Sequence, residues 1–224
     1  MNRNIVLLVV AIICIGGLIA EYKYINRKNS NGTNDTEPPP TEQVGSFSAS
    51  SGEYMLYMHS TLVGNSIEPG YVLREGNRFE AQRGGWVEFD GCIDAPEYTL
   101  PVKFHLRENS SLGLMRPPAV DIEKGSFAVR VPAGSMGLRV NLKSPEYSMS
   151  AQCLASDADM LVLREGVRLI VIVYRGSARL WNTKGEIVVA ANEKGSITPD
   201  EMPAAAEPIK DSDRPADVLG LFRK

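Results

Sequence analysis

Few residues of this sequence have the type and spacing that catalysis requires. Residues 133–137, AGSMG, approach the G-x-S-x-G nucleophile elbow around Ser135, and His59 and His105 are the two histidines of the chain. An elbow needs a strand, a sharp turn and then a helix. Residues 138–142 instead alternate apolar and polar side chains, as a strand does. The sequence therefore predicts a turn between strands at Ser135, an exposed His105 on the polar face of its strand, and no catalytic residue.

Metal and cofactor sites are not expected either. Asp157 and Asp159 lie two residues apart and suggest a carboxylate pair or a calcium site. No third ligand follows with the spacing of an EF-hand loop, so the pair is predicted to lie in a solvated loop. The sequence contains no CxxC motif and no cluster of cysteine and histidine.

The three cysteines are Cys14, Cys92 and Cys153. Cys14 lies within an apolar N-terminal segment, whereas Cys92 and Cys153 lie far apart in a region rich in predicted strands. If that region is exported, Cys92 and Cys153 could form a disulfide. Two free or buried thiols are the alternative.

Three large aromatic residues could line a ligand-binding face: Trp86, Trp181 and Tyr174. Aromatic rings of this kind bind sugars in many β-proteins, but in a run of short strands they are more often part of the core. Both interpretations stay open at this point.

The stretch that organises the chain runs from residue 167 to residue 198. It contains apolar, β-branched runs that are separated by breaks at residues 175–176, 182–185 and 192–195. Glycine and asparagine in these breaks tolerate the positive φ of tight turns. The pattern predicts a β-meander of about four strands. Residues 169–173 are apolar at every position, so both faces of this strand should be covered, by the C-terminal tail or by residues 54–63.

The preceding region continues the same pattern. Alternation predicts strands at residues 102–107, 127–131 and 138–142, and further candidates occur at 54–63, 71–73, 86–89 and 120–122. Residues 90–91 and 123–126 are predicted to be turns. Many short strands at such spacing predict an all-β domain over residues 53–199. We expect a sandwich or a short β-solenoid of antiparallel strands.

The N-terminal part has a different composition. Residues 5–20 are uncharged and apolar, and with the flanking tyrosines they predict a transmembrane signal anchor over residues 5–25, after a cytoplasmic segment of residues 1–4. A signal peptide cleaved near Ala20 is the alternative. Residues 26–52 predict a disordered, Pro- and Ser-containing linker. Residues 200–224 predict an extended tail whose apolar end, residues 218–222, docks on the domain or frays.

Charge argues against nucleic acid as a partner. The net charge is −3, and because the first 28 residues carry +3, the remainder carries −6. An acidic domain without a basic patch does not attract a polyanion.

Residues 123–199 resemble FecR-like domains. The segment at residues 123–132, EKGSFAVRVP, is similar to the strand pair G-x-φ-x-V-x-V of that family. The segments at 142–147, 154–162, 170–180 and 189–195 follow in the family's order. The Gly-Thr pair of the family is replaced by Ala155-Ser156-Asp157. Members that regulate sigma factors carry a helical domain before the membrane helix, where this sequence has four residues, so anti-sigma activity does not carry over.

The resemblance implies an exported β domain that is tethered to the cytoplasmic membrane, with its C-terminal domain in the periplasm. We therefore expect a non-catalytic module for protein interaction or signal sensing, without cofactor, whose partner is a protein of the cell envelope. A carbohydrate- or peptidoglycan-binding domain is the alternative. It depends on the aromatic residues Trp86, Trp181 and Tyr174.

Overall fold

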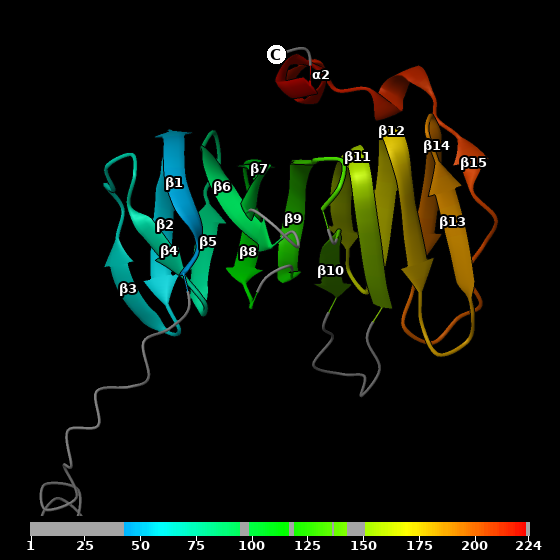
Figure 1. Ribbon diagram of the computed structural model, residues 1–224, viewed down its shortest axis with the longest axis horizontal. Coiled ribbons are helices and arrows are strands. Elements are labelled where there is room, and N and C mark those ends of the chain that lie inside the picture. The colour runs from blue at the N-terminus through cyan, green and yellow to red at the C-terminus, as the bar shows by residue number, and fades with distance from the viewer. Residues whose placement is uncertain (1–42, 95–98, 117–118, 136, 143–150, 223–224) are drawn as a thin grey trace, which may run out of the picture. The chain divides into compact units, whose positions relative to one another are not determined.

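Strands make up most of the regular structure in a computed structural model, shown in Figure 1. The structure describes residues 43–94, 99–116, 119–135, 137–142 and 151–222, without the side chains of 92–94 and 99–100. The strands are β1 (Gln43–Ser51), β2 (Tyr54–Met58), β3 (Thr61–Gly64), β4 (Val72–Arg74), β5 (Asn77–Ala81), β6 (Trp86–Asp94), β7 (Thr99–Leu106), β8 (Ser110–Leu114), β9 (Ala119–Val131), β10 (Leu138–Leu142), β11 (Ala151–Glu165), β12 (Arg168–Trp181), β13 (Glu186–Ala190), β14 (Glu193–Ile197) and β15 (Glu207–Pro208). A 3-10 turn, η1 (Asp211–Asp213), and a short helix, α2 (Ala216–Phe222), follow.

All these strands belong to one large sheet that is mostly antiparallel. The exception is β10, which runs parallel to the beginning of β9. The mostly β architecture agrees with the all-β class that the alternation predicts.

The sheet has two halves that share three long strands. Half A has the strand order β4-β1-β6-β7-β9-β11-β12-β14-β15, and half B has the order β3-β2-β5-β8-β9-β10-β11-β12-β13. Strands β9, β11 and β12 pair with one set of neighbours over one part of their length and with another set over the rest. Each of them therefore passes from one half to the other.

A residue with positive φ marks the passage in each long strand. These residues are Gly125 in β9 (φ 73°), Asp157 in β11 (φ 47°) and Gly176 in β12 (φ 78°). The sequence pattern predicts that strands end in turns at residues 123–126 and 175–176. Both predictions are wrong, because β9 and β12 continue through these residues. Residues with positive φ occur both in hairpin turns, where a strand ends, and at bends within a continuous strand. A glycine in the sequence therefore does not by itself distinguish the two.

One hydrophobic core lies between the two halves. Aromatic rings from opposite halves contact each other: the ring centroids of Phe79 in β5 and Phe89 in β6 are 5.2 Å apart, and those of Phe47 in β1 and Tyr54 in β2 are 5.8 Å apart. These contacts bury the apolar residues that alternate with polar ones along each strand.

The outer face of β12 is covered as well. Val171 and Val173 belong to the main core, whereas Ile172 on the other face packs in a second cluster with the fully buried Val218 of α2. The prediction that residues 169–173 are covered on both faces is confirmed, and the cover is the C-terminal tail. The tail is not extended throughout, because its last described turn is the helix α2.

Other boundaries differ from the predicted ones. Residues 54–63 form a hairpin of β2 and β3 rather than one strand, because His59 takes a positive φ of 56° between them. Residues 90–91 continue β6. Residues 43–51 form β1, so the prediction that the disordered linker extends to residue 52 is wrong. The predicted anchor at residues 5–25 lies outside the described residues, and within those that are described no helix has the length and apolarity to cross a membrane.

Candidate functional site

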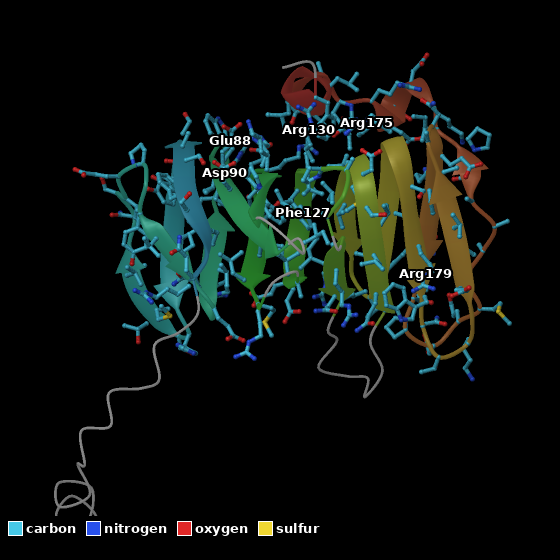
Figure 2. All side chains as sticks on the ribbon, in the orientation of Figure 1. Glu88, Asp90, Phe127, Arg130, Arg175 and Arg179 are labelled. Atoms are coloured by element: carbon cyan, nitrogen blue, oxygen red, sulfur yellow. The ribbon has the colours of Figure 1, made fainter. Side chains whose placement is uncertain are left out.

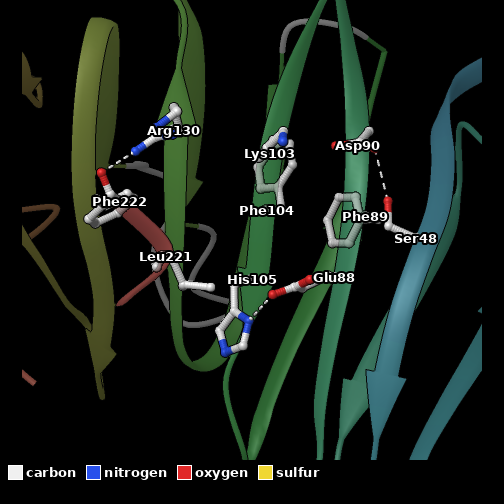
Figure 3. Close-up of a pocket in the computed structure, with 11 residues that line it drawn as sticks. Ser48, Glu88, Phe89, Asp90, Lys103, Phe104, His105, Arg130, Leu221 and Phe222 are labelled. Atoms are coloured by element: carbon white, nitrogen blue, oxygen red, sulfur yellow. Dashed lines mark hydrogen bonds and ion pairs between the residues drawn. The ribbon is translucent and has the colours of Figure 1, made fainter. Parts of the chain in front are cut away.

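A cleft of about 210 Å³ lies on the outer face of half A, beside α2 (Figure 3). Strands β6, β7 and β9 form its floor, and β1 and α2 form its sides. Polar side chains of the strands face apolar side chains of the helix across it. The lining residues that carry polar groups are Ser48, Glu88, Asp90, Lys103, His105 and Arg130, and those of α2 are Leu221 and Phe222.

His105 and Glu88 form one polar pair in the cleft. The Nδ1 atom of His105 is 3.1 Å from a carboxylate oxygen of Glu88, and the indole of Trp86 stacks on the imidazole with 5.4 Å between ring centroids. The side chain of His105 is only 13% exposed. The predicted exposure of His105 is therefore wrong, because its neighbours on the polar face of the sheet cover it.

Ser48 belongs to a separate pair. Its hydroxyl donates to the carboxylate of Asp90 at 2.9 Å, not to His105. The other candidate nucleophile, Ser135, donates to the carbonyl oxygen of Pro132 at 2.9 Å and accepts from the backbone N–H of Gly137 at 3.3 Å. It closes the connection from β9 to β10, as the strand pattern predicts, and the described contacts of both serines lack a histidine.

Arg130 joins the cleft to a buried carboxylate. Its Nε atom is 3.0 Å from a carboxylate oxygen of Asp159. A terminal nitrogen of its guanidinium donates to the backbone carbonyl of Phe222 at 2.6 Å, and the guanidinium carbon lies 5.7 Å from the centroid of the Phe222 ring. Arg175 contacts both Asp157 and Asp159 at 3.3 Å. The two aspartates are thus neutralised by arginines and lie at the bend of β11, not in the solvated loop that their spacing suggests.

We call residues 209–222 the C-terminal strap. Tyr174 of β12 donates its hydroxyl to the carbonyl of Asp213 at 2.7 Å, and Arg107, the residue after β7, binds Asp217 at 2.9 Å. Lys194 of β14 contacts Asp213 at 3.4 Å. Together with Val218, these contacts hold the strap across the outer face of half A.

The ionisation of the strap contacts reflects their surroundings. Burial, together with the nearby Asp213 carboxylate, raises the pKa of Tyr174 to about 12. The backbone N–H of Lys210 and the ammonium of Lys194 lower the pKa of Asp213. Desolvation opposes the charged form of Lys194, but Asp213 and Glu207 outweigh it and raise the pKa of this lysine.

The three candidate aromatic residues do not form one face. Trp86 lies on half A beside His105, and Tyr174 lies on half A with its ring 5.7 Å from that of Phe222. Trp181 lies on half B, where the Arg179 guanidinium is 5.2 Å from its ring centroid. Figure 2 shows Arg130 and Arg175 on the side nearest α2 and Arg179 well away from it. Both tryptophans are partly exposed.

Whether Cys92 and Cys153 form a disulfide stays open. Cys153 is fully buried in β11, and burial raises the pKa of its thiol to about 12. The side chain of Cys92 lies outside the described residues, so the disulfide stays a prediction. Within the described part of the chain, no group of three or more His, Cys, Asp or Glu side chains is arranged to hold a metal ion.

A second surface, which the sequence pattern does not predict, consists of exposed apolar side chains. We call it the N-terminal edge. It consists of Leu62 and Val63 in β3 with Tyr71 and Val72 at β4, and these side chains are 53%, 43%, 38% and 40% exposed. Four of the six exposed large hydrophobic residues in the described chain lie here. The only signal in the sequence is the uncharged run at residues 61–66.

Comparisons with known proteins give a distant likeness. No family model matches the sequence, and no curated protein matches it. A crystal structure of a candidate anti-sigma factor from Parabacteroides distasonis ATCC 8503 is similar, with a TM-score of 0.42 and 11% sequence identity over 61% of each chain. A second crystal structure with the same description gives a TM-score of 0.39 and 11% identity over 56% of this chain and 57% of that one. The matched region spans about three fifths of the length of these structures.

Proposed function

We propose that this protein is a FecR-like β domain, tethered to the cytoplasmic membrane, that binds another protein of the cell envelope outside the cytoplasm. The apolar residues 5–20 and the linker after them support the tether. The order of the motifs in residues 123–199 supports the family. We propose a non-catalytic role, which is supported by the separate pairings of Ser48, Ser135 and His105.

The N-terminal edge is the observation that carries the proposal. Within the part of the chain that the structure describes, β3 pairs with β2 alone and β4 with β1 alone, so each has a row of backbone groups that no described strand binds. Such edges invite pairing with another chain. Proteins that avoid this pairing place charges or proline on the edge, but β3 has the sequence TLVG and carries neither.

The occupant that fits this edge is an extended strand of a partner protein. Backbone hydrogen bonds to an exposed edge supply affinity in such complexes, and alternate side chains supply specificity. Here Leu62 and Val63 of β3 and Tyr71 and Val72 at β4 offer apolar contacts next to the unpaired backbone. Burying apolar surface stabilises a complex by roughly 25 cal/mol per Å² before the cost of association.

The other end of the sheet provides a matched control. Val188 in β13 is 61% exposed, and among the described strands β13 pairs with β12 alone. Like the residues of the N-terminal edge, Val188 is an exposed apolar side chain on an edge strand. It is a single residue, whereas the N-terminal edge has four. A contact that is specific to the N-terminal edge should therefore not involve Val188.

The test is site-specific photo-crosslinking of the full chain in its native membrane. A photoreactive residue at Val72 should give one discrete, identifiable protein adduct, and the same residue at Val188 should not. The double substitution Leu62→Lys, Val63→Lys should abolish the Val72 adduct while the protein stays folded. Equal adducts at both positions, or an adduct that survives the lysines, would overturn the proposal. A reporter that works only outside the cytoplasm, fused after Lys224, controls for orientation.

A further inference from the structure

A row of side chains crosses the outer face of half B in direct register. Asp121 of β9 lies opposite Asn141 of β10, Asn141 lies opposite Gln152 of β11, and Gln152 lies opposite Trp181 of β12. Their sequence neighbours Val120, Val140, Cys153 and Leu180 are buried in the main core. Because side chains alternate along a strand, the four residues of the row point to the outside.

The polar members of the row hold one another in place. The amide nitrogen of Asn141 donates to Asp121 at 2.9 Å, and the amide nitrogen of Gln152 donates to the Asn141 side-chain oxygen at 3.2 Å. An amide has two N–H donors and two acceptor lone pairs. Among the described residues, each amide therefore keeps a further N–H for a ligand, and Gln152 also keeps its carbonyl oxygen. The two hydrogen bonds already orient these groups.

A shallow cavity of about 280 Å³ adjoins the row. Arg139, Asn141 and Gln152 line it, together with Ala119, and Glu75, Met115 and Arg116 form the opposite side. Arg139 is exposed, and no described residue forms an ion pair with it. Its guanidinium offers up to five N–H donors to acceptor oxygens of a ligand.

The aromatic end of the row is Trp181. Its indole is partly exposed, and Arg179, which is 3.7 Å from Glu186, touches one face of the ring. Adjacent strands are about 4.8 Å apart, so the row extends about 14 Å from β9 to β12. The row therefore runs from an apolar ring through two amides to the carboxylate of Asp121, and the cavity that contains Arg139 adjoins the two amides.

We propose that this row binds a carbohydrate chain. A sugar has apolar C–H faces that stack on an aromatic ring and a rim of hydroxyls that donate and accept hydrogen bonds. One sugar unit stacks on Trp181, the hydroxyls of the next bind Gln152 and Asn141, and acceptor oxygens of a third reach Arg139. This site lies on half B, apart from the N-terminal edge, and it does not include Trp86 or Tyr174.

The test uses the full chain in detergent micelles with two probes, purified peptidoglycan sacculi in a co-sedimentation assay and chitotetraose in a calorimetric titration. We expect at least one probe to bind. Trp181→Ala and Gln152→Ala should each weaken that binding at least tenfold. Among the described residues the side chain of Gln152 makes one hydrogen bond, to Asn141, so the Gln152→Ala variant should fold even if Trp181→Ala does not.

Trp86→Phe is the matched control, because Trp86 is the other tryptophan and lies on half A; it should bind like the unchanged protein. Failure of both probes to bind, or binding that neither half B substitution reduces, would overturn the proposal. The N-terminal edge is tested separately by its lysine variant. That variant should leave carbohydrate binding unchanged, so the two proposals can fail independently.

Discussion

At the residue scale, the bend of β12 depends on a single atom that Gly176 lacks. Gly176 has a φ of 78°, and a Cβ atom at this position would overlap the backbone carbonyl oxygen of Asp157 in the neighbouring strand. Gly70 has a φ of 89°, but a Cβ atom there would meet nothing within 4 Å. Substitution of Gly70 therefore tests the backbone strain of positive φ alone, whereas substitution of Gly176 adds a steric overlap to that strain.

We expect Gly70→Ala to lower the free energy of unfolding by about 1–2 kcal/mol, the usual cost of a left-handed L-residue. Gly176→Ala should cost clearly more, since β11 and β12 must also move apart at the bend. Chemical denaturation of the two variants measures the difference. Equal losses would mean that the bend of β12 opens easily and does not hold the two halves together.

At the element scale, β12 and α2 stabilise each other through Ile172 and Val218. Ile172 is 4% exposed and Val218 is fully buried, in a cluster that Ala128 and Leu161 complete. Ile172→Ala should lower the free energy of unfolding by roughly 2–5 kcal/mol, as buried truncations of this size do. Val188→Ala on the exposed edge should change it by no more than about 0.5 kcal/mol.

A double-mutant cycle assigns the loss to the helix. If Ile172 is buried by the strap, the effect of Ile172→Ala should shrink when Val218→Ala is already present, because the two residues share one contact. Strict additivity in denaturation experiments would show that Ile172 is stabilised by the sheet alone.

At the scale of the whole molecule, the attachment of the C-terminal strap to half A should depend on pH. The pKa of Asp213 is lowered in the folded protein from its usual 3.8. A lowered carboxyl pKa contributes stability that is fully present above the unfolded value and is lost as the pH falls through the folded value. The strap should therefore loosen below about pH 4, and Asp213 protonation should weaken its contacts with Lys210 and Lys194.

Protection of the amides of residues 216–222 against hydrogen exchange measures this loosening. The protection should fall between pH 6 and pH 3 in the unchanged protein. In Asp213→Asn it should already be low at pH 6 and change less. Asp217→Asn is the control, because Asp217 contacts Arg107 but is half exposed. If Asp217→Asn removes the pH dependence and Asp213→Asn does not, the attribution to Asp213 is wrong.

The all-β class and several strands follow from the amino-acid pattern alone. Alternation placed β10 at residues 138–142 and found most of β7, because one face of each strand is buried and the other is not. The continuous apolar run at residues 169–173 indicated a strand covered on both faces, since no other arrangement hides every side chain. The turn at Ser135 was also predictable, because it depends only on neighbouring residues.

Which breaks end a strand, and which side chains meet, depends instead on contacts between segments that are far apart in the chain. Gly125 and Gly176 look like hairpin glycines in the sequence, but pairing with distant strands carries the chain through both bends. Strands β5 and β8 escaped prediction because buried polar residues, Asn77 in β5 and Ser110 and Ser111 in β8, interrupt the apolar pattern. The separation of Trp86 from Trp181, and the alignment of Trp181 with Gln152 and Asn141, follow from strand register, which no local pattern specifies.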